Sequence, residues 1–510
     1  MRTWTKHSLQ QVVAQRMRGY KFIAVSNREP YSHEHRNGKT ECVKPASGLT
    51  TAIDSIMRAS GGVWIAHGSG SADRITVDAH QHVRVPPEDP AYTLRRVWLP
   101  PEIERDYYYG LSNEGIWPLC HIVFHRPTFR RSDWESYQRA NELFAEAVLE
   151  EASGGPAFVF IQDYHFGLLP RILKRANPKL TIAQFWHIPW PPHEVFRTFP
   201  WKRELLEGLL GNDLLGFQLP GDCSNFLDTI GHNLEAFVDY DRAHVRMGDS
   251  ETAVRAFPIS IDFDERSQTA RSPEVSIAIA EWRALLGDMR EIVGIGIDRI
   301  DYTKGIPERL DAIHLLFQEH PEYLGRLTFV QVGAPSRTAI PDYCQLDNWL
   351  GRRVKEINLK WGSGSWKPIV LFRRHLDQTA LIALHQLADF CVVNALHDGM
   401  NLVAKEFVAS RIDRDGVLIL SAFAGSAREL TDALIVNPFA SAEIAGALHK
   451  AIAMPADERR RRMLRMRETV ELNNVYRWAA RFILALSSLG ASRAPGFRKP
   501  NESLIDTEVA

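Results

Sequence analysis

Polar and charged residues directly follow many of the short apolar runs in this sequence. If the runs are parallel strands, these residues lie at the carboxyl ends of the strands, where open α/β sheets bind ligands. Several are arginine or lysine, which indicates an anionic ligand such as a phosphate. Each residue alone is more often a cap or a turn, but together they predict a cleft. They are Asn27, Arg28, Asp163, His165, His187, Asp298, Arg299, Asp301, Lys304, Ser336, Arg337, His397, Asp398 and Gly399.

The stretch Asp398-Gly399-Met400-Asn401 joins the apolar run FCVVNA to the helical pattern LVAKEFVAS. Free backbone N–H groups at a helix N-terminus attract phosphate, and a glycine lets a ligand approach the backbone. Glu406 lies about a turn and a half into this helix, where its carboxylate could accept hydrogen bonds from ribose hydroxyls. The alternative is that Asp398 only caps the helix and Glu406 faces solvent.

Motifs of other enzyme classes are incomplete. Gly294 and Gly296 lack the third glycine of the dinucleotide-binding motif, and the sequence has neither a G-x-x-x-x-G-K-[ST] loop nor an H-E-x-x-H motif. Asp262 and Asp264 resemble the metal-binding D-x-D of some glycosyltransferases, but they fall in a linker after PISI. We therefore expect neither a metal nor a cofactor.

The elements that position these residues read as an α/β protein. The candidate strands are nearly continuous apolar runs, as expected where both faces of a parallel sheet are covered, and helical patterns separate them. This alternation predicts doubly wound sheets. The candidate strands span residues 22–26, 63–66, 157–162, 181–187, 214–218, 292–297, 327–332, 368–373, 390–395, 416–422 and 433–437.

One open sheet would be too wide for so many strands, so we expect two Rossmann-like lobes with a cleft between them. The best boundary is near 255–265, where a strand meets Pro258 and an acidic linker. The expected division is residues 1–257, residues 258–480 and a C-terminal segment 481–510. The chain after Leu489 is polar and rich in turn formers, which predicts partial disorder.

Composition excludes several protein classes. The 510 residues are 45% hydrophobic and carry 61 Lys+Arg against 62 Asp+Glu, a net charge of −1, which argues against a nucleic-acid-binding protein. The five cysteines are scattered and never spaced C-x-x-C, which favours a reducing compartment, so we expect a cytoplasmic protein. No apolar stretch approaches a membrane span, and we expect no membrane partner.

Several collinear stretches together resemble the trehalose-6-phosphate synthase family of retaining GT-B glycosyltransferases. The resemblance covers about residues 20–485. The most specific stretches are DYTKG-I-PERL (301–310) and DGMNLVAKE (398–406). The others are SNR (26–28), YYYGLSNEGIWPLCH (107–121), QDYHFGLLP (162–170), WHIPWPPHEVFRTFP (186–200), LLGFQ (214–218), APSR (334–337) and SAFAGSARELTDALIVNP (421–438).

The resemblance implies glucosyl transfer from UDP-glucose to glucose 6-phosphate, giving α,α-trehalose 6-phosphate and UDP. It implies that Arg28 and Arg337 hold the acceptor phosphate. The alternative for these arginines is a local ion pair, with Glu29 and Asp342 respectively. The other acceptor residues that it implies are Gly48, Tyr108, Trp117 and Asp163.

On the donor side, the resemblance implies that Arg299 and Lys304 neutralise the diphosphate and that Asp398 binds the donor-sugar hydroxyls. Glu406 would bind the ribose, and Leu376 would contact the nucleobase through its backbone. Gly399, Met400, Asn401, Leu402 and Val403 would supply the backbone beside the donor. His187 would lie beside the transferred sugar, so the implied catalytic set is His187, Asp163, Arg299, Lys304 and Asp398.

The sequence departs from the family pattern mainly near the acceptor. Ser47-Gly48-Leu49 stands where the family has G-G-L, His67 replaces a tryptophan, and His397 stands where arginine is frequent. These departures leave open a related synthase with another phosphorylated acceptor, such as a glucosylglycerol-phosphate synthase. A non-catalytic sugar-phosphate sensor on the same fold is the alternative outside enzymes. A homo-oligomer is an expectation from the family only.

Overall fold

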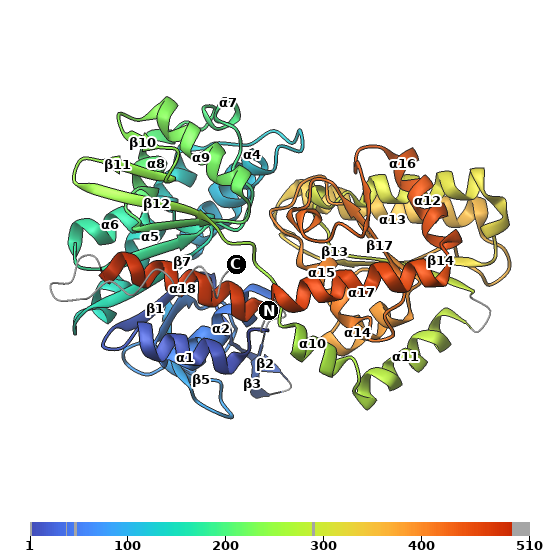
Figure 1. Ribbon diagram of the computed structural model, residues 1–510, viewed down its shortest axis with the longest axis horizontal. Coiled ribbons are helices and arrows are strands. Elements are labelled where there is room, and N and C mark those ends of the chain that lie inside the picture. Colours follow the sequence, from blue (N-terminus) through green and yellow to red (C-terminus); the bar gives the residue numbers. More distant parts are fainter. Residues whose placement is uncertain (1–2, 37, 45–47, 288–290, 492–510) are drawn as a thin grey trace.

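The computed structural model describes residues 3–36, 38–44, 48–287 and 291–491, which form two lobes side by side (Figure 1). The first lobe is built on a sheet whose strands are β1 Lys21–Arg28, β4 Val63–His67, β5 His82–Val85, β6 Tyr92–Val97, β7 Ala157–Gln162, β8 Thr181–Phe185, β9 Leu214–Phe217, β10 Phe237–Asp239, β11 His244–Met247 and β12 Ser250–Ala256.

The order of this ten-stranded sheet is β10-β11-β12-β9-β8-β7-β1-β4-β6-β5. The strands from β12 to β6 pair in parallel, and antiparallel strands complete both edges. A separate hairpin pairs β2 Ser32–Arg36 with β3 Lys39–Val43. The parallel strands end toward the middle of the molecule, which brings the polar residues that follow β1, β7 and β8 together.

Helices cover both faces of the first sheet. One face carries α1 Lys6–Arg16, α2 Gly48–Ser60 and α18 Val475–Ala491, and Phe22 and Ala24 of β1 pack with them. Ile23 and Val25 point to the other face, which is why β1 reads as a continuous apolar run. That face carries α5 Arg131–Glu151, α6 Leu169–Ala176, α8 Lys202–Leu209 and α9 Pro220–Asn233.

Shorter helical segments complete the first lobe. The π-helical segment η2 Arg105–Ile116 carries Tyr108 and runs directly into α4 Trp117–His121. Such wide turns are rare and are frequently found at functional sites. The remaining segments are α3 Pro101–Glu104, α7 His193–Phe196, η1 Asp73–Ile75 and η3 Tyr164–Phe166.

The second lobe contains a six-stranded, wholly parallel sheet in the order β15-β14-β13-β16-β17-β18. Its strands are β13 Ile292–Arg299, β14 Leu327–Ala334, β15 Ile369–Phe372, β16 Phe390–Val393, β17 Val417–Ser421 and β18 Leu434–Val436. Short 3₁₀ segments connect them: η4 Tyr302–Lys304, η5 Pro321–Tyr323 and η6 Gly425–Arg428. The predicted α/β class and doubly wound lobes are confirmed.

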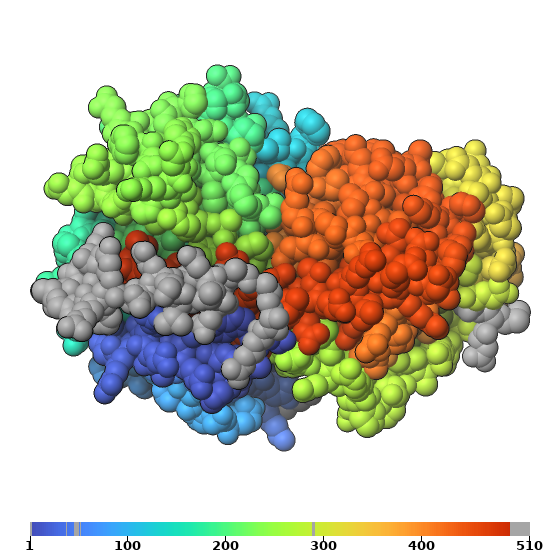
Figure 2. All heavy atoms as spheres, viewed as in Figure 1, coloured from blue at the N-terminus to red at the C-terminus, as the bar shows by residue number. Residues whose placement is uncertain are grey.

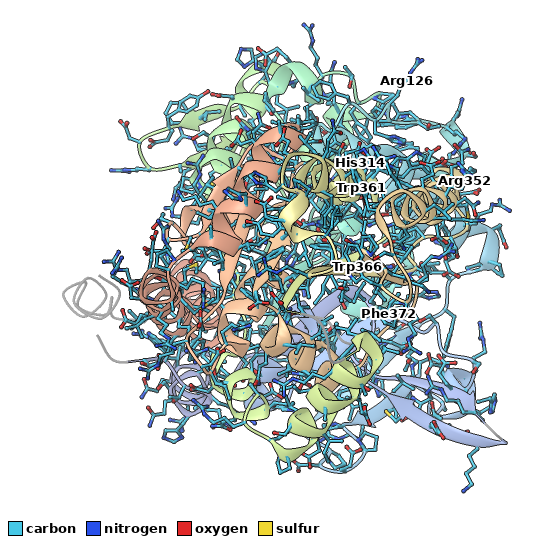
Figure 3. The ribbon with its side chains drawn as sticks, turned by 90° about the vertical axis from the view of Figure 1, so that its right-hand side faces the viewer. Arg126, His314, Arg352, Trp361, Trp366 and Phe372 are labelled. Carbon is cyan, nitrogen blue, oxygen red and sulfur yellow. The ribbon has the colours of Figure 1, made fainter. Side chains whose placement is uncertain are left out.

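Helices also cover both faces of the second sheet. One face carries α10 Phe263–Thr269, α11 Pro273–Leu286, α14 Gln378–Leu387, α15 Leu402–Ser410 and α17 Ala456–Leu472. The other carries α12 Ile306–Glu319, α13 Pro341–Trp361 and α16 Ser441–Ala453. Figure 3 views this lobe end-on and shows His314 of α12 beside Trp361 of α13, whose indole N–H donates to His314 Nδ1 at 3.1 Å.

The C-terminal helix returns to the first lobe. Figure 1 shows α17 on the second lobe and α18 across the first, where Trp478 and Phe482 pack into the core beneath the first sheet. The structure therefore differs from the predicted division, because residues 475–480 pack on the first lobe rather than the second. Of the segment predicted to be partly disordered, residues 492–510 lie outside the described residues.

All the strands expected from apolar runs are present, and β12 ends just before Pro258 as expected. The sequence patterns do not predict β2, β3, β5, β6, β10 and β11. Across the described ranges, none of the helices has the length and apolar character that a bilayer crossing requires.

Candidate active site

A cavity of about 190 Å³ lies between the carboxyl ends of the two sheets. Residues of both lobes line it, and it brings together the predicted residues Arg28, Tyr108, Trp117, Asp163, Arg299 and Arg337. The space-filling view shows the two lobes meeting along the middle of the molecule (Figure 2). The other lining residues are Ser26, Asn27, Glu29, Thr50, Trp64, Gln162, Tyr164 and His165.

The two predicted acceptor arginines reach this cavity from different lobes. Arg28 ends β1 and donates to the Tyr108 hydroxyl at 3.0 Å. Arg337 follows β14 in a left-handed conformation with φ of 49°, and its Nη1 donates to Asp301 Oδ2 at 3.2 Å. Its Nη2 donates across the lobes to the Tyr164 hydroxyl at 3.4 Å.

The local ion pairs considered for these arginines are not the ones formed. Glu29 instead accepts from Arg96 Nε at 2.9 Å, and Asp342 pairs with His125 at 3.0 Å. Arg337 does pair with a carboxylate, Asp301, from the segment that follows β13. Sequence distance is a poor guide here because Asp301 and Arg337 follow neighbouring parallel strands.

Trp117 lies beneath two of these guanidinium groups. The Arg337 guanidinium carbon is 4.0 Å from the centre of the indole ring, and that of Arg299 is 5.6 Å away. An aromatic face attracts a cation, so the indole holds both arginines beside the cavity. Arg299 is also 3.8 Å from Asp301 Oδ2.

Asp163 and His187 lie at the ends of neighbouring strands β7 and β8. Asp163 has a φ of 72°, and its Oδ1 accepts from the backbone N–H of His187 at 3.2 Å. Burial raises the pKa of Asp163 to about 7. Burial lowers the pKa of His187 to about 3, so the imidazole is neutral near pH 7, and its Nε2 lies 3.0 Å from Gln162 Oε1.

Lys304 and Asp398 form the second group of charges. Lys304 Nζ donates to Asp398 Oδ2 at 2.5 Å, and Asn401 Nδ2 donates to the same oxygen at 3.1 Å. Although burial alone would raise it, the pKa of Asp398 is lowered because Lys304 lies beside it. The pair is mostly buried and places a cation and a carboxylate at the end of β16.

The segment from Gly399 to Val403 begins α15 and touches the first lobe. Asn401 caps the helix, accepting from Ala404 N at 3.3 Å. A Cβ atom at Gly399 would lie 2.3 Å from the carbonyl oxygen of His187. Met400 is buried in the first-lobe core, and Leu402 packs against the cores of both lobes. The helix start therefore lies directly opposite His187.

The cavity lining does not include His187, Lys304, Asp398 or residues 399–403, and two further predicted residues, Glu406 and Leu376, also lie outside it. Glu406 lies one turn into α15 with Oε2 3.7 Å from Arg266 Nη2, so it does not simply face solvent. Leu376 is half-buried just before α14 and packs against the second-lobe core. Gly48 is the first residue of α2, two residues before Thr50, which does line the cavity.

Of the polar residues that line the cavity, Asn27 and His165 are among the predicted strand-end residues, whereas the sequence analysis did not single out Gln162. Some of their buried atoms have no hydrogen-bond partner among the described residues: Asn27 Oδ1, Gln162 Nε2 and both ring nitrogens of His165. Buried polar atoms are normally paired, so these atoms are available to a ligand. Gln162 could have been found from its position, because it is the last residue of β7 and directly precedes Asp163.

Two departures from the family pattern, His67 and His397, do not line the cavity. His67 Nδ1 lies 3.1 Å from the Val97 carbonyl oxygen, and its Nε2 is 3.6 Å from Glu104. His397 Nδ1 lies 2.7 Å from the carbonyl oxygen of His121 and so joins the lobes. Ser47 lies outside the described residues.

Metal-ligand groups in the described part of the chain lie away from the cavity. Asp262 caps α10 by accepting from Glu265 N, and it also accepts from the Tyr476 hydroxyl. His320, Glu322 and His449 gather at the ends of α12 and α16. Their two imidazole rings stack face to face at 3.8 Å, so their in-plane lone pairs run parallel rather than converge on one ion. We assign no metal to either group.

Two doubly wound lobes with a polar cleft at the carboxyl ends of their sheets form the GT-B architecture. The sequence model of glycosyltransferase family 20 matches residues 20–488. The chain belongs to this family. The prediction from the motifs is thereby confirmed.

Relatives and solved structures agree with this assignment. The chain is 38% identical over 478 residues to a trehalose-6-phosphate synthase of Mycolicibacterium vanbaalenii, covering 92% of this chain and 96% of that one. An E. coli structure bound with UDP-2-fluoro glucose superposes with a TM-score of 0.82 at 30% identity, covering 92% and 99% of the two chains. The structure of a UDP-forming synthase of Burkholderia xenovorans in complex with glucose-6-phosphate superposes with a TM-score of 0.82 at 30% identity. The match covers 91% of this chain and 99% of that one.

Proposed function

We propose that this protein transfers glucose from UDP-glucose to glucose 6-phosphate with retention, giving α,α-trehalose 6-phosphate and UDP. The observation that carries the proposal is one cavity in which Arg28, Arg299 and Arg337 meet from two lobes. Two of its curated relatives are a trehalose-6-phosphate synthase and a bifunctional synthase/phosphatase of Thermoproteus tenax, 37% identical over 486 residues.

In this proposal the acceptor binds on the first lobe. Arg28 and Arg337 grip its phosphate, because the planar guanidinium group binds phosphate oxygens in pairs and keeps its charge at any working pH. Tyr108 and Trp117 pack against the sugar. Asp163 accepts hydrogen bonds from its hydroxyls, and Gly48 lies at the start of the neighbouring helix.

The donor binds between β13, β16 and the start of α15. Arg299 and Lys304 stabilise the negative charge that develops on the diphosphate as the glycosidic bond breaks. Asp398 binds the glucose hydroxyls, and Glu406 binds the ribose. The backbone from Gly399 to Val403 lies beside the phosphates, and that of Leu376 beside the base.

The chemistry needs no covalent nucleophile from the protein. The acceptor hydroxyl attacks the face from which UDP departs, and an oxygen of the leaving phosphate takes its proton. A neutral His187 then orients the sugar through hydrogen bonds instead of acting as a strong base, consistent with its lowered pKa. The cytoplasmic location and a homo-oligomeric state remain predictions.

The direct test is UDP release from UDP-glucose with glucose 6-phosphate, set against glycerol 3-phosphate as the acceptor. Glucose 6-phosphate should support turnover, and glycerol 3-phosphate should support little. The reverse preference would favour the glucosylglycerol-phosphate synthase alternative, and no turnover with either would favour a sensor. His67 gives the alternative acceptor no support, since it does not line the cavity among the described residues.

A further inference from the structure

Asp301 lies between the donor and acceptor arginines. Its carboxyl group is fully buried at the end of β13. Oδ1 accepts from the backbone N–H and the hydroxyl of Thr303 at 3.0 and 2.9 Å, which fixes the orientation of the group. Oδ2 faces two guanidinium groups: it lies 3.2 Å from Arg337 Nη1 and 3.8 Å from Arg299 Nη2.

The two arginines share a second partner. Both lie over the indole of Trp117, and Tyr343 completes the group, with its hydroxyl 2.5 Å from Arg337 Nη1 and 3.4 Å from Asp301 Oδ2. The carboxylate and the ring thus connect the two guanidinium groups, with Arg337 held by hydrogen bonds and Arg299 in looser contact.

Asp301 is ionised under working conditions. Burial alone would raise the pKa of its carboxyl group, but Arg337, Arg299 and Lys304 hold that pKa at about 2. The residue therefore acts as a fixed negative charge among cations. It does not line the cavity and so acts through the arginines.

We propose that Asp301 is a positioning residue that sets the orientation of both Arg337 and Arg299, and so links the acceptor-phosphate site to the donor-diphosphate site. The inference rests on the proposed function for the identity of the two anions. The geometric observation, that one carboxylate oxygen faces two arginines of one cavity, is independent of the proposed function.

Two effects of Asp301 on anion binding oppose each other. Its negative charge repels phosphate, so a carboxylate that only balanced charge would weaken binding, and its removal would tighten binding. A positioning carboxylate has the opposite effect, as with the outer partners that orient metal ligands, whose loss typically costs about 10- to 100-fold in affinity or activity. The sign of the change therefore separates the two roles.

The test is the variant Asp301→Asn, which keeps the shape and removes the charge. We expect the KM for glucose 6-phosphate and that for UDP-glucose each to rise about 10-fold or more, with a lower kcat. Asp415→Asn is the matched control, since Asp415 pairs with Arg459 through two hydrogen bonds of 2.7 and 3.2 Å far from the cavity. The control should leave both KM values within about twofold of the wild-type values.

A double-mutant cycle with Arg337→Ala separates positioning from general damage. If Asp301 acts through Arg337, Asp301→Asn should change the acceptor KM by less than about threefold once Arg337 is absent. Equal effects in both backgrounds, or tighter binding of both substrates to Asp301→Asn, would overturn the proposal.

Binding of inorganic pyrophosphate, measured by calorimetry, keeps the test independent of the proposed reaction. Pyrophosphate requires the anion-binding groups, including Arg299, but no sugar site and no glucosyl transfer, and its dissociation constant should rise about 10-fold in Asp301→Asn. A wild type that binds pyrophosphate but shows no glucosyl transfer would contradict the proposed function and leave this inference standing. An unchanged or lower dissociation constant in the variant would contradict the inference alone.

Discussion

Arg337 illustrates what single residues contribute to this site. It lies on the second lobe, has a left-handed backbone, stacks on an indole of the first lobe and bonds to a tyrosine of the first lobe. The motif APSR predicts that this arginine is functional. The sequence does not predict its partners, because Asp301 and Tyr343 reach Arg337 through the fold of the second lobe and Tyr164 reaches it where the two lobes meet.

Arg299 and Lys304 belong to the donor side in this account. Replacing either with alanine removes a charge-assisted contact worth about 1.5–3 kcal/mol, so kcat should fall on the order of 10- to 150-fold. The KM for glucose 6-phosphate should change far less. Initial rates with each substrate varied in turn provide the check. If a variant kept near-normal kcat and lost only affinity for glucose 6-phosphate, the replaced residue would have to be assigned to the acceptor site instead.

Asp163 should make the stability of the protein depend on pH. Its folded-state pKa of about 7 lies above the value of about 4 in an unfolded chain. The folded state therefore holds this proton more tightly, so the free energy of unfolding falls as the pH rises from about 4 to about 7 and stays at the lower value above pH 7. Asp163→Asn cannot ionise, so above pH 7 it should be more stable than the wild type by about 1–3 kcal/mol.

Urea unfolding of both proteins at pH 8.5 and pH 4.5 measures this effect. The advantage of Asp163→Asn should be present at the higher pH and nearly absent at the lower, while its glucosyl transfer falls at both. An advantage of the same size at both pH values would show that Asp163 does not titrate as described.

The start of α15 is the element that joins donor site and first lobe. Gly399 lies so close to the His187 carbonyl oxygen that a Cβ atom would approach it to 2.3 Å. Gly399→Ala should push the helix start away from His187 and lower kcat on the order of 10- to 100-fold, because a displacement of about 1 Å can cost that much.

Gly446→Ala is the control for this substitution. Gly446 lies within α16, and a Cβ atom there would meet nothing within 4 Å. The control should keep full activity and gain up to about 1 kcal/mol of stability from helix propensity. Full activity in Gly399→Ala would mean that the close approach of α15 to His187 is not needed for turnover.

Elements differ in how well the sequence predicts them. Buried parallel strands such as AFVFIQ read clearly because both faces are covered. The hairpin strand SHEHR and the strand YTLRRV carry polar or charged residues and lie in a small hairpin or near a sheet edge, so no apolar run marks them. The sequence also does not predict that α18 packs on the first lobe, because an apolar helix face does not indicate which sheet it will cover.

At the scale of the whole molecule, the chain crosses between the lobes near residues 257–262 and again before α18. Among the described residues, the polar contacts that join the lobes elsewhere include Arg337 with Tyr164, His397 with the His121 carbonyl and His125 with Asp342. A hinge at the crossings would let the cleft close around the donor. Small-angle scattering should show a smaller radius of gyration with UDP than without it. An unchanged radius would argue against closure on UDP.

The central claim is that Arg28 and Arg337 make a phosphorylated sugar obligatory as acceptor. The most direct measurement compares the initial rate of UDP release from UDP-glucose with glucose and with glucose 6-phosphate, in the wild type and in Arg28→Ala. The account predicts that free glucose is a very poor acceptor and that Arg28→Ala raises the KM for glucose 6-phosphate far more than that for UDP-glucose. Comparable wild-type rates with glucose and glucose 6-phosphate would contradict it.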